Sequence, residues 1–171
     1  IAAYQVSLGA PHLESGLETE IKMARAYELS GDLATAVVAY QDIYSRASND
    51  YTKAHLDLLI GQAYTTLGNT EQAQAAYLDA VNNYPLSYDS YLALLELVEA
   101  GVPVDELQRG LVDYFAGEYA VAVAAFDRYL MDDSADPSTA LYYKGLALSD
   151  LGNYEAAIRT WEQLIRDYPD S

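Results

Sequence analysis

Two histidines and one aspartate-rich segment are the residues whose types and spacing could support catalysis or metal binding. His12 and His55 are the only histidines in the chain. Neither lies in a triad-like order with a serine and a carboxylate, as nucleophilic catalysis requires, so we interpret both as surface or groove residues. Residues 132–136 (DDSAD) alternate like the start of a calcium-binding loop, but the glycine and the distal glutamate of such a loop are missing. We interpret this segment as a helix end that leads into the N-cap of the next helix.

Other chemical motifs are missing in the same way. Glu96 and Glu99 share one turn of a predicted helix, yet the sequence places no partner for acid–base chemistry beside them. The sequence contains no P-loop, no dinucleotide-binding glycine motif and no HExxH zinc motif. It therefore predicts no catalytic residue, no cofactor-binding residue and no metal ligand, and we expect that the chain is not an enzyme.

Composition limits the partners of the chain. The formal net charge is −17, and such a surface repels the phosphate backbone of nucleic acids. Neutral or basic ligands are therefore favoured. There is no cysteine, so disulfides and thiolate metal sites are excluded, and no apolar run is long enough to cross a membrane. We expect no nucleic-acid binding and no membrane insertion.

The element that organises the chain is the segment from Gly61 to Pro85, which reads as two amphipathic helices joined by a Gly-Asn turn. Gly61 and Ala73 are small, and we interpret them as places where helix backbones cross closely. Tyr64 and Tyr77 are predicted to fill the gaps beside these crossings. Gly68 is predicted to end the first helix in the left-handed conformation, and Asn69 with Gln72 resembles an N-capping box for the second.

The same five-position spacing recurs three more times, with a small residue, a variable aromatic slot, a turn glycine, an alanine and an aromatic residue. The further copies are Ala24, Tyr27, Gly31, Ala36 and Tyr40; Gly110, Asp113, Gly117, Ala122 and Phe126; and Gly145, Leu148, Gly152, Ala157 and Trp161. This pattern resembles the tetratricopeptide repeat (TPR), a helix–turn–helix unit of about 34 residues. The resemblance implies an all-α fold, a right-handed superhelical solenoid.

The predicted organisation is a single TPR-like solenoid with four repeats, at 17–50, 54–86, 103–136 and 138–171. Residues 1–16 are predicted to be the tail of an upstream repeat, with Ser15 and Glu18 as a capping box for the next helix. Asp32 and Asp136 are predicted N-caps. The ending 168–171 (YPDS) resembles 84–87 (YPLS), after which another helix is expected. We therefore expect that these 171 residues are a segment of a longer protein.

An extra helix is predicted between the second and third repeats, at 87–100. Gly68 and Gly117 are 49 positions apart, whereas the other neighbouring turn glycines are separated by 37 and 35. The stretch from Tyr84 to Gly101 also bears a weaker resemblance to the superhelical region of bacterial soluble lytic transglycosylases. That resemblance implies a bacterial cell-envelope setting, but the catalytic domain of those enzymes has no counterpart in this sequence.

The TPR resemblance also implies where a ligand would bind, because the first helix of each repeat lines a concave groove in that family. The implied groove residues are Arg25, Glu28, Gln62, Thr66, Leu107, Leu111, Tyr114, Phe115 and Tyr142. Further positions on the same helix faces are Ile21, Leu29, His55, Leu58, Thr65, Leu146 and Asp150. Arg25 is the only cation among these positions, so the resemblance does not extend to members that bind a terminal carboxylate.

Three functions remain open from the sequence. The favoured one is a scaffold that binds a protein or peptide, with basic ligand residues attracted by the acidic surface. The second is the non-catalytic superhelix of a murein-processing enzyme in the bacterial envelope. The third is self-association through uncapped ends, because Trp161, Leu164 and Ile165 lie on a helix side with no following helix to cover it. The localisation stays open between the bacterial cell envelope and the cytoplasm.

Overall fold

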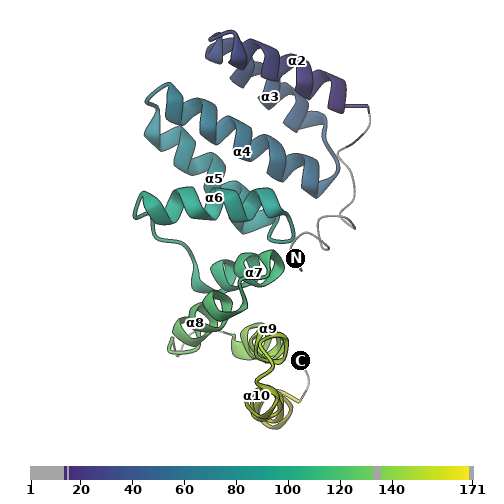
Figure 1. Cartoon of the computed structure of the whole chain (residues 1–171), viewed down its shortest axis with the longest axis vertical. Coiled ribbons are helices and arrows are strands. Elements are labelled where there is room, and N and C mark those ends of the chain that lie inside the picture. The colour runs from purple at the N-terminus through teal and green to yellow at the C-terminus, as the bar shows by residue number, and fades with distance from the viewer. Residues whose placement is uncertain (1–13, 15, 133–135, 170–171) are drawn as a thin grey trace. The chain divides into compact units, whose positions relative to one another are not determined.

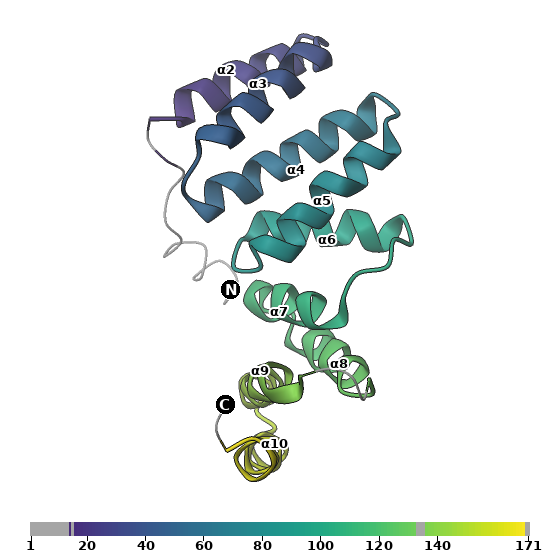
Figure 2. The same cartoon turned by 180° about the vertical axis from the view of Figure 1, so that it is seen from behind.

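The computed structural model describes residues 14, 16–132 and 136–169. This part of the chain forms nine α-helices and no strand (Figures 1 and 2). The helices are α2 (Glu18–Leu29), α3 (Leu33–Arg46), α4 (Asp50–Thr66), α5 (Thr70–Asn83), α6 (Tyr88–Glu99), α7 (Glu106–Ala116), α8 (Tyr119–Tyr129), α9 (Pro137–Asp150) and α10 (Tyr154–Asp167). The predicted all-α repeat fold is confirmed, while the right-handed sense of the superhelix stays a prediction.

The helices fall into two compact units, which divide between Pro103 and Val104. In the first unit, α2 pairs with α3, α4 pairs with α5, and α6 packs on both α4 and α5. In the second unit, α7 pairs with α8, α9 pairs with α10, and α9 also packs on α8. The extra helix α6 therefore packs against the second repeat in the way that α9 packs against the third. The assignment of the whole chain to a single solenoid stays a prediction.

Glycines end the first helix of every pair, as their spacing predicts. Gly31, Gly68, Gly117 and Gly152 all have φ between 76° and 89°, a region that other residues rarely enter because of their Cβ atom. Gly101 has a φ of 66° and follows the extra helix in the same way. Each of the four repeat turns therefore reverses the chain at a position where glycine is needed.

The glycine that opens three of the four copies of the pattern accommodates an aromatic ring from the second helix. A Cβ atom added to Gly61 would collide with the ring of Tyr77. In the same way, a Cβ atom added to Gly110 would collide with the ring of Phe126, and one added to Gly145 would collide with the ring of Trp161. This corrects the sequence interpretation, because the space is required by a side chain rather than by a backbone crossing.

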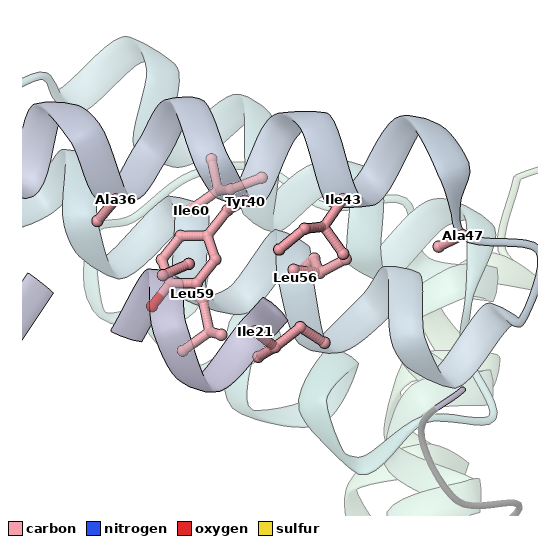
Figure 3. Close-up of a cluster of buried hydrophobic side chains, with 9 residues drawn as sticks. Ile21, Ala36, Tyr40, Ile43, Ala47, Leu56, Leu59 and Ile60 are labelled. Carbon is pink, nitrogen blue, oxygen red and sulfur yellow. The ribbon is translucent and has the colours of Figure 1, made fainter. Parts of the chain in front are cut away.

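The core of the first unit forms where the first two helix pairs meet (Figure 3). Tyr40 and Ile43 of α3 pack with Leu56, Leu59 and Ile60 of α4. Burial of side chains of this size stabilises a fold by about 1.5–3 kcal/mol each. The four pattern alanines Ala36, Ala73, Ala122 and Ala157 are all buried, as predicted.

Two predictions about the aromatic slot and the caps need correction. Tyr27 is exposed and does not fill a packing slot, whereas Tyr64 is half-buried against the core. Asn69 is the N-cap residue of α5, but its side chain makes no capping hydrogen bond, so the predicted capping box is wrong. Asp32 and Asp136 do cap α3 and α9, by accepting from the backbone N–H groups of Thr35 and Ser138.

Some sequence predictions fall at different residues or outside the described ones. Helix α4 begins at Asp50, four positions before the predicted start of the second repeat, because the Asn49 side chain accepts from the Thr52 N–H group and caps the helix there. The predictions for residues 1–13, His12 and Ser15, and most of segment 132–136, lie outside the described residues.

Candidate peptide-binding surface

Aromatic side chains of α7 and α9 gather into one cluster in the second unit. The ring centroids of Tyr114 and Phe115 on α7 lie 5.3 Å apart, and both rings contact Tyr143 on α9, at 5.4 Å and 5.6 Å. Tyr142 extends the cluster, with its ring 5.2 Å from that of Tyr143. The edge-on and tilted ring pairs have the geometry that aromatic side chains favour. The structure thus brings together the three aromatic candidates of this unit.

Exposure separates the members of this cluster into contact residues and supporting residues. Tyr142 is 49% exposed, while Tyr114 and Phe115 are half-buried. Leu107 and Leu111 are also half-buried, and they pack against the core formed by Ala122, Phe126, Ala140 and Ala147. The two leucines therefore support the aromatic rings, and Tyr142 is the exposed member of the cluster.

A cavity of about 300 Å³ adjoins the exposed end of this cluster. Its lining combines two tyrosine rings and an aliphatic side chain with two hydroxyl groups from the first turn of α9. The lining residues are Ser138, Thr139, Tyr142, Tyr143 and Leu164. An apolar hollow with a few polar groups at its edge is the usual character of a binding site for one or two anchoring side chains.

The electrostatics of the cluster are acidic. Burial, followed by the negative charge of Asp150, raises the pKa of the Tyr114 hydroxyl to about 12. The Asp150 carboxylate, which is exposed at the end of α9, thus lies next to the aromatic rings. A carboxylate beside tyrosine faces is a suitable environment for a Lys or Arg side chain, which both groups attract.

The candidate residues of the first unit are less suited to bind a ligand. Arg25, Gln62 and Thr66 are exposed, but the Thr66 hydroxyl donates to the Gln62 backbone carbonyl of its own helix. Glu28 is half-buried and accepts a 2.7 Å hydrogen bond from the Tyr40 hydroxyl. These side chains do not form an apolar cluster comparable with that of the second unit.

Two of the further groove positions are buried, contrary to the sequence prediction. Ile21 belongs to the core of the first unit, and Leu58 is 4% exposed on α4, the helix against which α6 packs. His55 is half-buried, and its Nδ1 lies 3.3 Å from a carboxylate oxygen of Asp89 on α6. The extra helix therefore covers part of the predicted groove of the second repeat.

The sequence prediction missed Tyr143, which lies at the centre of the aromatic cluster, and Tyr119, whose ring lies 5.7 Å from that of Tyr114. Tyr143 follows Tyr142 directly, so the adjacent pair was a usable signal. Within the described residues, no group of acidic or histidine side chains could hold a metal ion. None of the described helices has the length and apolar character that crossing a membrane requires.

Comparison with known families supports the repeat assignment. The family model of the tetratricopeptide repeat matches residues 56–87 and 139–171, which cover most of the α4–α5 pair and the α9–α10 pair. Two helix pairs of the chain therefore match the tetratricopeptide repeat. Repeats of this family generally mediate protein–protein interaction and are typically non-catalytic scaffolds. A comparison with curated proteins finds no match.

Proposed function

We propose that the second unit binds an extended or helical peptide segment of another protein across α7 and α9. The observation that carries this proposal is the aromatic cluster of Tyr114, Phe115, Tyr142 and Tyr143, which ends at an accessible cavity. Binding hot spots favour rigid aromatic side chains that become desolvated in the complex. Tyr142 and the cavity would receive the apolar anchor of the ligand.

The charge of the chain supports a preference for basic ligands. Asp150 lies beside the tyrosines, and the whole chain has a net charge of −17. A Lys or Arg at the edge of the ligand would gain attraction from both, and this part of the affinity would weaken as salt screens the charges. The predicted ligand therefore combines an apolar anchor with flanking basic residues.

A displayed library of random peptides tests the proposal and does not require an identified ligand. We expect that the chain enriches sequences with an apolar or aromatic residue near Lys or Arg. For an enriched peptide, Tyr142→Ala and Tyr114→Ala should each weaken the affinity by about tenfold or more, as expected for a hot-spot residue. Tyr142→Phe, which keeps the ring, and Arg25→Ala, in the other unit, should matter less. Parent-like binding by both folded alanine variants would place the site elsewhere.

The exposed side of α10 supports a second function, which is self-association. Tyr154, Ile158 and Ile165 are 65%, 53% and 70% exposed, and their spacing places them with Trp161 on one face of the helix. An exposed apolar stripe of this length favours association. The lytic-transglycosylase alternative rests on the sequence of residues 84–101 alone, and a lysozyme-like domain in the same polypeptide would favour it.

A further inference from the structure

Two aspartates of the first unit lie in contact inside the fold. Asp57 of α4 is 5% exposed, and its carboxyl lies within hydrogen-bonding range of the carboxyl of Asp79 on α5. No donor group reaches the buried Oδ2 atom of Asp57. Two carboxylates cannot hydrogen-bond to each other unless one of them carries a proton, because an ionised carboxylate only accepts.

The remaining hydrogen bonds indicate which carboxyl carries the proton. Asp79 accepts from the Tyr44 hydroxyl of α3 at 2.6 Å and from the side-chain amide of Asn83 at 2.7 Å. Because the Tyr44 hydrogen points to Asp79, the Tyr84 hydroxyl at 2.9 Å donates to the Tyr44 oxygen. Asp79 thus has the donors that an ionised carboxylate needs, whereas Asp57 lacks them and suits the protonated form.

The charged groups that act on Asp57 include Asp79 and Lys53. Lys53 lies on the same helix as Asp57, and its Nζ sits 5.8 Å from the centre of the Tyr44 ring. Its charge opposes protonation of Asp57, but this effect is smaller than those of burial and of Asp79. On α6, Asp89 is paired with His55. The balance of these groups leaves the carboxyl pair in a mainly acidic and buried environment.

We propose that Asp57 and Asp79 share one proton at neutral pH, and that its release to solvent in mildly alkaline solution weakens the attachment of α3 to α4 and α5. The Tyr44–Asp79 hydrogen bond joins the first repeat to the second, so this pair sits at the junction of two repeats. Once the proton has left, two negative charges face each other in a poorly solvated site. Separation of the helices relieves this repulsion by admitting water.

The direction of the pH effect follows from the same geometry. Burial, followed by the charge of Asp79, raises the pKa of Asp57 from 3.8 to about 8. A raised pKa in the folded state means that the stabilising contribution is complete below the ordinary value and is lost as the pH rises through the folded value. Between pH 6 and 8, the unfolding equilibrium constant should therefore rise by up to about tenfold per pH unit.

Carbon-13 NMR of the aspartate carboxyl groups in the unmodified chain tests the proton directly. We expect one carboxyl carbon, assigned to the pair, to titrate above pH 6, with an apparent pKa that belongs to both residues. The amide protons of α3 should lose hydrogen-exchange protection over the same pH interval. Titration of both carboxyls below pH 5 would overturn the proposal, and this result does not depend on the folding of any variant.

A pair of variants separates this device from general pH sensitivity. Asp57→Asn keeps the shape and can donate to Asp79 without a titrating proton, so the rise in the unfolding constant between pH 6 and 8 should disappear. Asp50→Asn removes an exposed carboxylate of the same helix and should leave the slope unchanged. An unchanged slope in Asp57→Asn, or equal flattening in both variants, would show that the pair does not control stability.

Discussion

The second and fourth repeats have the same spacing of pattern residues. Their second helices differ in environment, because α5 is covered by another helix and the same face of α10 is exposed. On α5, Tyr77 and Val81 are buried where α6 packs. The equivalent positions on α10 are Trp161, which is half-buried, and Ile165, which is 70% exposed. The same repeat pattern therefore produces a covered face in the first unit and an open apolar face in the second.

The same difference is seen in the N-terminal part of this face on the two helices. Thr70 and Gln74 of α5 correspond to Tyr154 and Ile158 of α10 in the repeat spacing. The covered face has polar side chains there, while the exposed face has large apolar ones. Since exposed apolar surface is costly in water, the difference indicates that this side of α10 is built to contact other apolar groups.

The largest effect is expected from truncation on the covered side. Leu97 of α6 is fully buried, so Leu97→Ala should destabilise the first unit by about 2–5 kcal/mol through lost burial and a cavity. Ile165→Ala, on the open side, should change the stability by less than about 0.5 kcal/mol. Denaturant unfolding followed by circular dichroism measures both. Equal losses in the two variants would contradict the contrast between the faces.

The repeat pattern could be predicted because turn glycines, small residues and aromatic residues act locally or between neighbouring helices. Gly31 and Gly68 are examples, since a left-handed turn requires glycine wherever it occurs. The burial of Leu58 could not be read from the spacing, because it depends on where α6 packs. The contact between Asp57 and Asp79 was missed for the same reason, as it joins residues on two helices whose relative rotation the sequence alone does not define.

The candidate binding surface was predictable only in part. Tyr114, Phe115 and Tyr142 follow from the helix face that the TPR resemblance implies, and the structure joins them in one cluster. Tyr143, at the centre, faces both the core and the cluster, so a division into core and groove residues misplaces it. Glu28 was expected to face a ligand, but it accepts the Tyr40 hydrogen bond instead.

The second unit also has a buried carboxyl, that of Asp113. Its pKa is raised less than that of Asp57, because its charged neighbour is positive rather than negative. Burial raises the pKa of Asp113 to about 6, although the charge of Arg109, whose Nε lies 3.8 Å away, opposes the rise. The stabilising contribution of protonated Asp113 is therefore complete below pH 3.8 and is lost as the pH rises through about 6.

Asp113→Asn should flatten the pH dependence of unfolding between pH 4 and 6, where one proton accounts for at most about 1.4 kcal/mol per pH unit. Trp161 is the only tryptophan and lies in the second unit, so its fluorescence follows that unit. The slope between pH 6 and 8 should stay as in the parent, because above about pH 6 Asp113 is ionised in both the folded and the unfolded state. If Asp113→Asn changes the upper interval instead, the roles assigned to the two carboxyls are wrong.

The smallest effect on the fold, and the clearest on assembly, is expected on the open face of α10. Ile158→Glu introduces a charge into the exposed apolar stripe, where it should leave monomer stability within about 0.5 kcal/mol. It should shift sedimentation toward the monomer and prevent the change in Trp161 fluorescence that we expect of the parent at rising concentration. The row Glu155, Arg159, Glu162 and Arg166 flanks the stripe. Because its charges alternate, two antiparallel copies of α10 can bring opposite charges close together. Reversal of Arg159 and Arg166 to Glu should therefore weaken the same association, and less so in high salt. A parent chain that stays monomeric at millimolar concentration would contradict self-association.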